Sequence, residues 1–138
     1  MSDSSTCVEI AKRFYRHLDK GEFVQLNALM SADGVYFRPG NRRVQAGQSL
    51  IDDLGSRSKT VNMVHLLTNL FADVSGNNAT VHGYMTVFIS DDGKAYTGPA
   101  PAPIPSPKTI YDLDIQLTKQ GAEWRIVKVQ NVVKFTAA

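Results

Sequence analysis

Asp112 and Asp114 lie in the segment 111–117, where apolar and polar residues alternate. A period of two predicts a β-strand with one apolar face. A carboxylate in the middle of such a strand either points to water or lies in an enclosed cavity, where burial raises its pKa and makes it a proton donor or acceptor. The sequence leaves both positions open and does not decide which of the two acids would face a cavity.

His65 is a second candidate for proton transfer. It lies between Met63 and Leu67 on one side of a predicted apolar strand. Histidine has an ordinary pKa near neutrality, which suits general acid or base catalysis, and a carboxylate such as Asp114 or Asp19 could orient its ring. The alternative is a buried histidine that bonds only to backbone groups.

Three further polar residues could complete such a site. Tyr15 and Asp19 are four residues apart in a predicted helix and share a face, so they could position a substrate hydroxyl. Alternatively, Tyr15 packs at the edge of the core and Asp19 caps the helix end. Asn131 lies on the same strand face as Val129, where it could bind a ligand or make an edge or dimer contact.

The composition, with 43% apolar and 20% charged residues, is that of one globular domain spanning residues 1–138. The net charge of +2 is too small to indicate nucleic acid or a membrane surface as a partner. The single cysteine, Cys7, excludes an intramolecular disulfide, and the N-terminus lacks the features of a signal peptide, so we expect a cytoplasmic location. Three scattered histidines and no glycine-rich phosphate loop predict neither a metal nor a cofactor.

The elements that must position these residues follow from periodicity. We expect helices at 6–20, 22–30 and 48–54, a short strand at 35–37, and two long hairpins formed by 61–74 with 79–90 and by 109–118 with 123–135. Five prolines in segment 98–107 predict an extended loop, which is either a surface connection or a flap or partner contact. This order predicts an α+β fold: a cone-shaped α+β barrel with N-terminal helices on the concave face of a strongly curved antiparallel or mixed sheet.

Several segments resemble the nuclear transport factor 2-like superfamily, and within it the SnoaL-like, ketosteroid isomerase-like and scytalone dehydratase-like proteins. The resemblance is carried by residues 14–23, Gly47, 64–69, 78–79, 111–114 and 124–126, which come in the same order over most of the chain. It is specific for the fold and weak for the function, because this superfamily contains isomerases, dehydratases, cyclases and proteins without catalysis.

The resemblance also implies roles for individual residues. Asp114, with Asp112 second, matches the strand acid of these proteins; His65 matches a strand histidine and Asp19 the helix acid of the dehydratases. The isomerase's general base and oxyanion tyrosine are replaced by Arg38 and Phe14, which disfavours steroid isomerisation.

The interpretation is an apolar pocket for a small cyclic or aromatic molecule. An enzyme would use Asp114, His65, Asp19 and Tyr15 for an isomerase, cyclase or dehydratase step, and the predicted ligand contacts are Phe14, Asn131, Val129 and Asp112. The alternative is a non-catalytic binding or assembly domain. A homodimer is expected through the outer sheet face, to which Val127 and Val129 are assigned.

Overall fold

The computed structural model describes all residues, 1–138, and contains three helices and seven strands. The helices are α1 (Asp3–Lys20), α2 (Phe23–Ala28) and α3 (Gln48–Gly55). The strands are β1 (Met30–Arg38), β2 (Arg42–Gln45), β3 (Asn62–Ser75), β4 (Asn78–Ser90), β5 (Pro107–Gln120), β6 (Glu123–Val129) and β7 (Val132–Thr136). No helix combines the length and the apolar character needed to cross a membrane.

Helix α1 begins earlier than the sequence predicts. Ser2 is its N-cap, and its hydroxyl oxygen accepts a hydrogen bond from the backbone N–H of Ser5 at 3.1 Å. The predicted cap, Thr6, already lies inside the helix and donates its hydroxyl proton to the Ser2 carbonyl. The end of α1 is as predicted, because Gly21 adopts a left-handed conformation with φ 73°.

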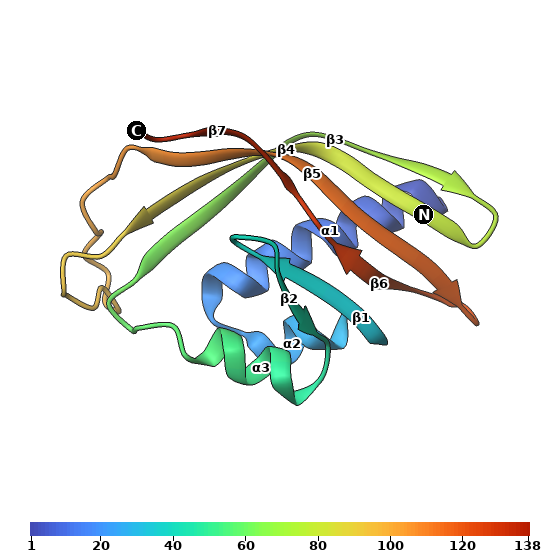
Figure 1. The fold of residues 1–138 in the computed structure, drawn as a ribbon, viewed down its shortest axis with the longest axis horizontal. Helices are drawn as coiled ribbons and strands as arrows, with labels where there is room; N and C mark the ends of the chain where they lie inside the picture. The colour runs from blue at the N-terminus through green and yellow to red at the C-terminus, as the bar shows by residue number, and fades with distance from the viewer.

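The strands form one curved sheet in the order β2-β1-β6-β5-β4-β3, and β7 pairs with the first part of β5. All neighbours are antiparallel except β1 and β6, which are parallel. The sheet arches over the helices in Figure 1, with α1 beneath β3 and β4. Because β2 and β3 are the two edges and do not pair, the sheet is unclosed, and the expected α+β arrangement is confirmed without a closed barrel.

Two predicted strands have different bounds in the structure. The expected strand 123–135 is divided into β6 and β7, because the chain leaves the first pairing at Gln130 and Asn131 and returns to another part of β5. Strand β1 begins at Met30 rather than at Val35, and it includes Gly34, where a Cβ atom would lie 2.9 Å from the Ile126 carbonyl oxygen. Only glycine permits this close approach of β1 and β6.

The core lies between the concave face of the sheet and α1. On β5 the buried side chains are Leu113, Ile115 and Leu117, which are at most 2% exposed and face the helices. Asp112 and Asp114 alternate with them and therefore point to the outer, convex face. The expectation that one of these carboxylates faces a cavity beneath the sheet is wrong.

Candidate functional site

The residues Asp19 and His65 form a directly bonded pair where the end of α1 crosses β3. Asp19 Oδ1 lies 2.6 Å from His65 Nδ1, and Asp19 Oδ2 accepts a hydrogen bond from the backbone N–H of His65 at 3.0 Å. Both side chains are largely buried, with 15% and 9% of their surface exposed. Since a carboxylate accepts hydrogen bonds, Nδ1 is the protonated nitrogen, and Nε2 is left as the atom that can exchange a proton.

Asp19 is thus the acid that orients His65, and of the two carboxylates considered for this role the structure selects the helix residue. The unpaired edge of β3 explains this choice. The backbone N–H of His65 points away from β4, so it needs an acceptor from outside the sheet, and the last turn of α1 supplies one.

Tyr15 lies one helical turn before Asp19 and beside the same histidine. Its ring centroid is 5.1 Å from that of His65. Its hydroxyl oxygen accepts a hydrogen bond from Asn131 Nδ2 at 2.7 Å. Burial raises the pKa of Tyr15 well above its usual value, with a further increase from Tyr36, while the bond from Asn131 lowers it. Tyr15 is therefore a neutral hydrogen-bond donor at ordinary pH rather than a phenolate base.

Asn131 connects the helix to the break between β6 and β7. Its Oδ1 accepts a hydrogen bond from the backbone N–H of Asp114 at 2.9 Å while its amide nitrogen serves Tyr15. The structure thus brings together Tyr15, Asp19, His65 and Asn131, whereas Asp114 joins them only through its backbone.

The carboxylates of Asp112 and Asp114 line a different groove, on the outer face of the sheet. This groove has a volume of about 410 Å³ and also includes Phe71, His82 and Tyr84. The His82 ring stacks on Phe71 with a centroid distance of 5.1 Å, and its Nε2 lies 3.2 Å from an Asp73 oxygen. The groove therefore combines aromatic and acidic side chains on the convex side, away from His65.

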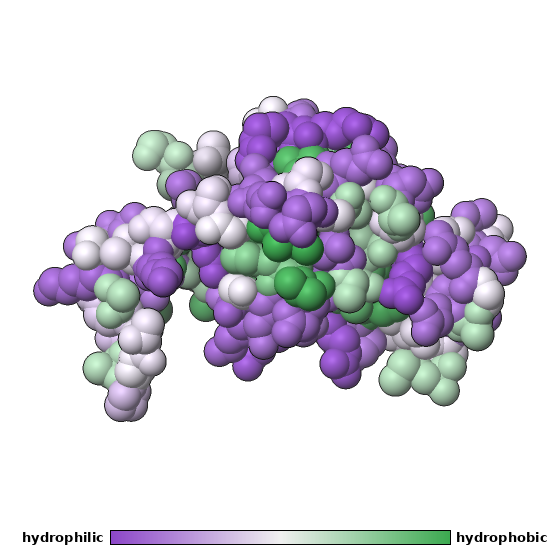
Figure 2. Space-filling view, turned by 90° about the horizontal axis from the view of Figure 1, so that it is seen from below, coloured by the Kyte–Doolittle hydropathy of each residue, from purple (hydrophilic) through white to green (hydrophobic).

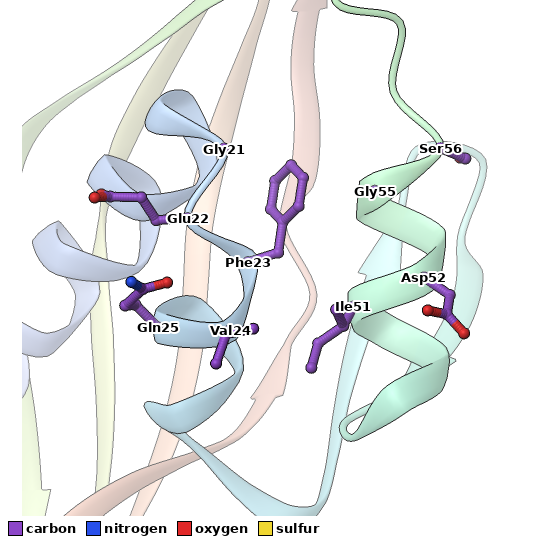
Figure 3. A pocket seen from close by; sticks show the side chains of 9 residues that line it. All are labelled: Gly21, Glu22, Phe23, Val24, Gln25, Ile51, Asp52, Gly55 and Ser56. Atoms are coloured by element: carbon purple, nitrogen blue, oxygen red, sulfur yellow. The ribbon is translucent and has the colours of Figure 1, made fainter.

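Two other grooves open on the helical side of the molecule. One, of about 450 Å³, lies between α1 and β3 and is lined by Tyr15, Asp19 and His65 together with Lys12, Arg16 and Lys20. The other, of about 620 Å³, lies between α2 and α3, where Phe23 and Ile51 point into the space between the helices (Figure 3). Figure 2 shows an apolar area at the centre of this side, surrounded by hydrophilic side chains. All three grooves are open to solvent.

The remaining predicted ligand contacts, Phe14 and Val129, are fully buried core residues and line none of these grooves. Phe14 packs edge-on against Tyr15 and Tyr36, with ring centroids 5.1 and 5.2 Å away. Its contribution to the site is to hold the two tyrosines in place.

A cluster of charges at the end of β1 was not found by sequence reasoning. Arg42 binds both carboxylate oxygens of Asp53, at 2.7 and 3.2 Å, and its hydrogen bonds lower the pKa of this acid. Arg38 lies beside the same carboxylate, and its Nη1 is 3.5 Å from the Tyr36 hydroxyl. The only signal in the sequence was that the resemblance places the isomerase's base at Arg38. No group of three or more His, Cys, Asp or Glu side chains is arranged to hold a metal ion.

Solved structures with the same fold are numerous, at low sequence identity. A nuclear transport factor 2-like protein with a cystatin-like fold from Novosphingobium aromaticivorans is 18% identical, with a TM-score of 0.74 and coverage of 97% of this chain and 83% of that one. A protein from the same organism, provisionally named a scytalone dehydratase, is 18% identical with a TM-score of 0.71 and coverage of 96% and 85%. A protein from Catenulispora acidiphila, solved in complex with S-DNPA, is 16% identical with a TM-score of 0.70 and coverage of 94% and 91%.

No curated protein matches the chain by sequence. The sequence pattern of the SnoaL-like domain, by contrast, matches residues 1–130, which include α1, the edge strand β3 and the whole of β6. With this match and the agreement in fold, the chain belongs to the SnoaL-like domain family.

Proposed function

We propose that this protein is a cofactor-independent enzyme of the isomerase, cyclase or dehydratase type, which acts on a small cyclic or aromatic molecule by proton transfer. The observation that carries the proposal is the Asp19–His65 pair, in which one carboxylate holds both the ring and the backbone N–H of a largely buried histidine. General acid–base catalysis needs a base that a neighbouring group holds in a fixed orientation, and Asp19 holds His65 in this way.

The roles follow from the contacts. His65 Nε2 removes or returns the proton, while Asp19 fixes the tautomer and stabilises the charged imidazolium. Tyr15, whose oxygen accepts a bond from Asn131 and whose hydroxyl group interacts with Tyr36, turns its proton to a substrate oxygen when one binds, where negative charge develops during proton abstraction. Tyr15 and Asn131 thus position the substrate and Asp19 positions the base.

The groove between α1 and β3 supports access to this pair, because Tyr15, Asp19 and His65 all line it. Small-molecule binding is also supported by the related fold that was solved with S-DNPA. A fold shared at low identity does not carry a substrate with it, so the substrate class is proposed from the chemistry of the site.

The test is proton exchange. Cyclic ketones and hydroxyketones are incubated with the protein in D2O, and loss of the α-proton signal is followed by NMR. We expect exchange in the wild type and a loss of about a hundredfold or more in His65→Asn and Asp19→Asn. Asp52→Asn, which removes an exposed acid on α3, is the matched control. Equal exchange rates in wild type and His65→Asn would refute the proposal.

A second candidate function, assembly as a homodimer, is favoured by the outer face of the sheet. The pairing register places Leu66, Tyr84 and Val132 on this face, and they are 48, 39 and 60% exposed. Of the residues first assigned to such an interface, Val129 is buried in the core and does not belong to it, while Val127 is half-buried. Exposed apolar side chains that gather on one sheet face are typical of a subunit interface.

Sedimentation measures this candidate directly. We expect the wild type to be a dimer at micromolar concentration and Leu66→Glu to be a monomer. Val24→Glu places the same charge at an exposed apolar position on α2, 64% exposed, and should stay dimeric. A wild type that sediments as a monomer would exclude the homodimer.

A further inference from the structure

The guanidinium groups of Arg38 and its neighbour Arg42 carry more positive charge than the nearby carboxylate neutralises. Its Nε atom is buried and makes no hydrogen bond, and the nearest carboxylate oxygen, Asp53 Oδ2, is 3.4 Å away. Asp53 is instead bound through both oxygens by Arg42. Two guanidinium groups thus share one carboxylate, which leaves one positive charge unbalanced at this end of β1.

Arg38 also lies beside Tyr36, whose ring packs against Phe14 next to Tyr15 of the proposed site. Its Cζ atom lies 5.3 Å from the ring centroid of Tyr36, and its Nη1 lies 3.5 Å from the Tyr36 hydroxyl. Burial raises the pKa of Tyr36, so this hydroxyl keeps its proton. A neutral phenol next to a guanidinium offers two kinds of donor and no negative charge, which is the environment that an oxyanion requires.

Arg57 is a third cation near Arg38, and it brings no free acid that could neutralise the excess positive charge. Arg57 donates a hydrogen bond from Nη1 to the Leu18 carbonyl at 2.8 Å. Asp19, the acid whose charge raises the pKa of Arg57, is already bound to His65. The charge of Arg38 is among the causes that lower the pKa of Arg57, after burial, so the two cations are close enough to repel each other. Binding of an anion would relieve this repulsion.

We propose that Arg38, together with the Tyr36 hydroxyl, binds a carboxylate group of the ligand and so makes small cyclic or aromatic carboxylates the preferred substrate class. This inference rests on the proposed function for the reaction but concerns a separate group of atoms. The guanidinium side chain is 23% exposed, so its terminal nitrogens are within reach of a ligand. The planar fork of arginine matches the two oxygens of a carboxylate.

Binding of 1-naphthoate and of its neutral analogue 1-naphthamide to the full chain tests the proposal by calorimetry. We expect naphthoate to bind the wild type more tightly than naphthamide, and Arg38→Gln to weaken naphthoate about tenfold or more while naphthamide is unaffected, because a charge-assisted hydrogen bond is lost. Arg43→Gln, which removes the same charge from an exposed position on β2, is the matched control and should bind like the wild type. Equal naphthoate affinity in wild type and Arg38→Gln, or no preference for naphthoate over naphthamide, would overturn the proposal.

A measurement on the wild type covers the case in which Arg38→Gln fails to fold. The Nε–Hε signal of Arg38, assigned by its disappearance in Arg38→Lys, should shift in a ¹⁵N correlation spectrum when naphthoate is added and stay in place with naphthamide. A signal that does not respond to naphthoate refutes the site.

These results do not depend on turnover. Naphthoate binding is measured without any reaction, so a failure of the proton-exchange test would leave the carboxylate site intact. Conversely, exchange that is abolished in His65→Asn, together with equal naphthoate affinity in wild type and Arg38→Gln, would support the acid–base site and refute the carboxylate site.

Discussion

Alkaline pH should destabilise this protein through two buried tyrosines, Tyr15 and Tyr36. Both are at most 5% exposed, and burial is the main cause that raises the pKa of each above the usual value. In the unfolded chain a tyrosine loses its proton near pH 10, at about its ordinary pKa. Above that pH the unfolded state releases protons that the folded state retains, so the free energy of unfolding falls as the pH rises towards the folded-state pKa values.

The magnitude follows from proton linkage. Each tyrosine that is ionised in the unfolded state and protonated in the folded state lowers the free energy of unfolding by about 1.4 kcal/mol per pH unit. The two together contribute a slope of up to about 2.7 kcal/mol per pH unit. Since a domain of this size is stable by only about 5–15 kcal/mol, one or two pH units above 10 produce a large effect.

The assay is urea unfolding followed by circular dichroism at several pH values from about 9 to 12. Tyr15→Phe and Tyr36→Phe should each reduce the slope by up to half, and Tyr84→Phe, on the outer face, is the control. The pKa of Cys7, raised to about 11 mainly by burial, adds the same contribution to every variant and cancels in the comparison. Slopes that are identical in wild type and in both core variants would refute the reasoning that these hydroxyls stay protonated.

Three further outcomes follow from individual contacts. Asn131→Leu removes both hydrogen bonds of this amide and leaves two buried partners unsatisfied, so thermal or urea unfolding should show a loss of about 2–4 kcal/mol. Gly83→Ala should lower the free energy of unfolding by about 1–3 kcal/mol in the same assay, because the residue has φ 155° and its Cβ would lie 2.7 Å from the Thr68 carbonyl oxygen. The control Gly98→Ala, whose Cβ would meet no atom within 4 Å, should leave the stability unchanged. The Cys7 thiol should react with an alkylating reagent only when the protein unfolds, since it is fully buried and its pKa is raised to about 11; fast labelling of the native protein would contradict this.

Local patterns in the sequence predict much of this fold because they act within single elements. The alternation in the two long hairpins, the turn at 75–78 and the helix stop at Gly21 all depend on neighbouring residues, and the structure contains each of them. The division of the last strand depends instead on two separate pairings along β5, and β1 with its parallel partner β6 depends on contacts almost a hundred residues apart. Periodicity carries no information on such pairings.

The site was predictable only in part, for the same reason. His65 and Asp19 are 46 residues apart, and their bond depends on how α1 packs on the edge of the sheet. The position of Asp114 was misjudged because the resemblance rests on the order of segments, whereas a shift of one residue moves a strand side chain to the opposite face. The alternation of residues in this strand already predicts the orientation of Asp114. Because the apolar Leu113 and Ile115 must face the core, the acid between them must face away.

Experiments in solution on Asp114→Asn test whether this carboxylate lies at the reaction site or on the outer face of the sheet. Its carboxylate lies in the outer groove, and only its backbone N–H reaches Asn131, so we expect proton exchange within about twofold of the wild type, against a loss of about a hundredfold in Asp19→Asn. The same substitution should strengthen the proposed dimer, because burying a carboxylate in a subunit interface is costly and an amide lowers that cost. Exchange rates and sedimentation on the same samples measure both effects. If Asp114→Asn loses as much exchange as Asp19→Asn while its dimer is unchanged, the carboxylate acts in the reaction and the assignment of the outer face to assembly is wrong.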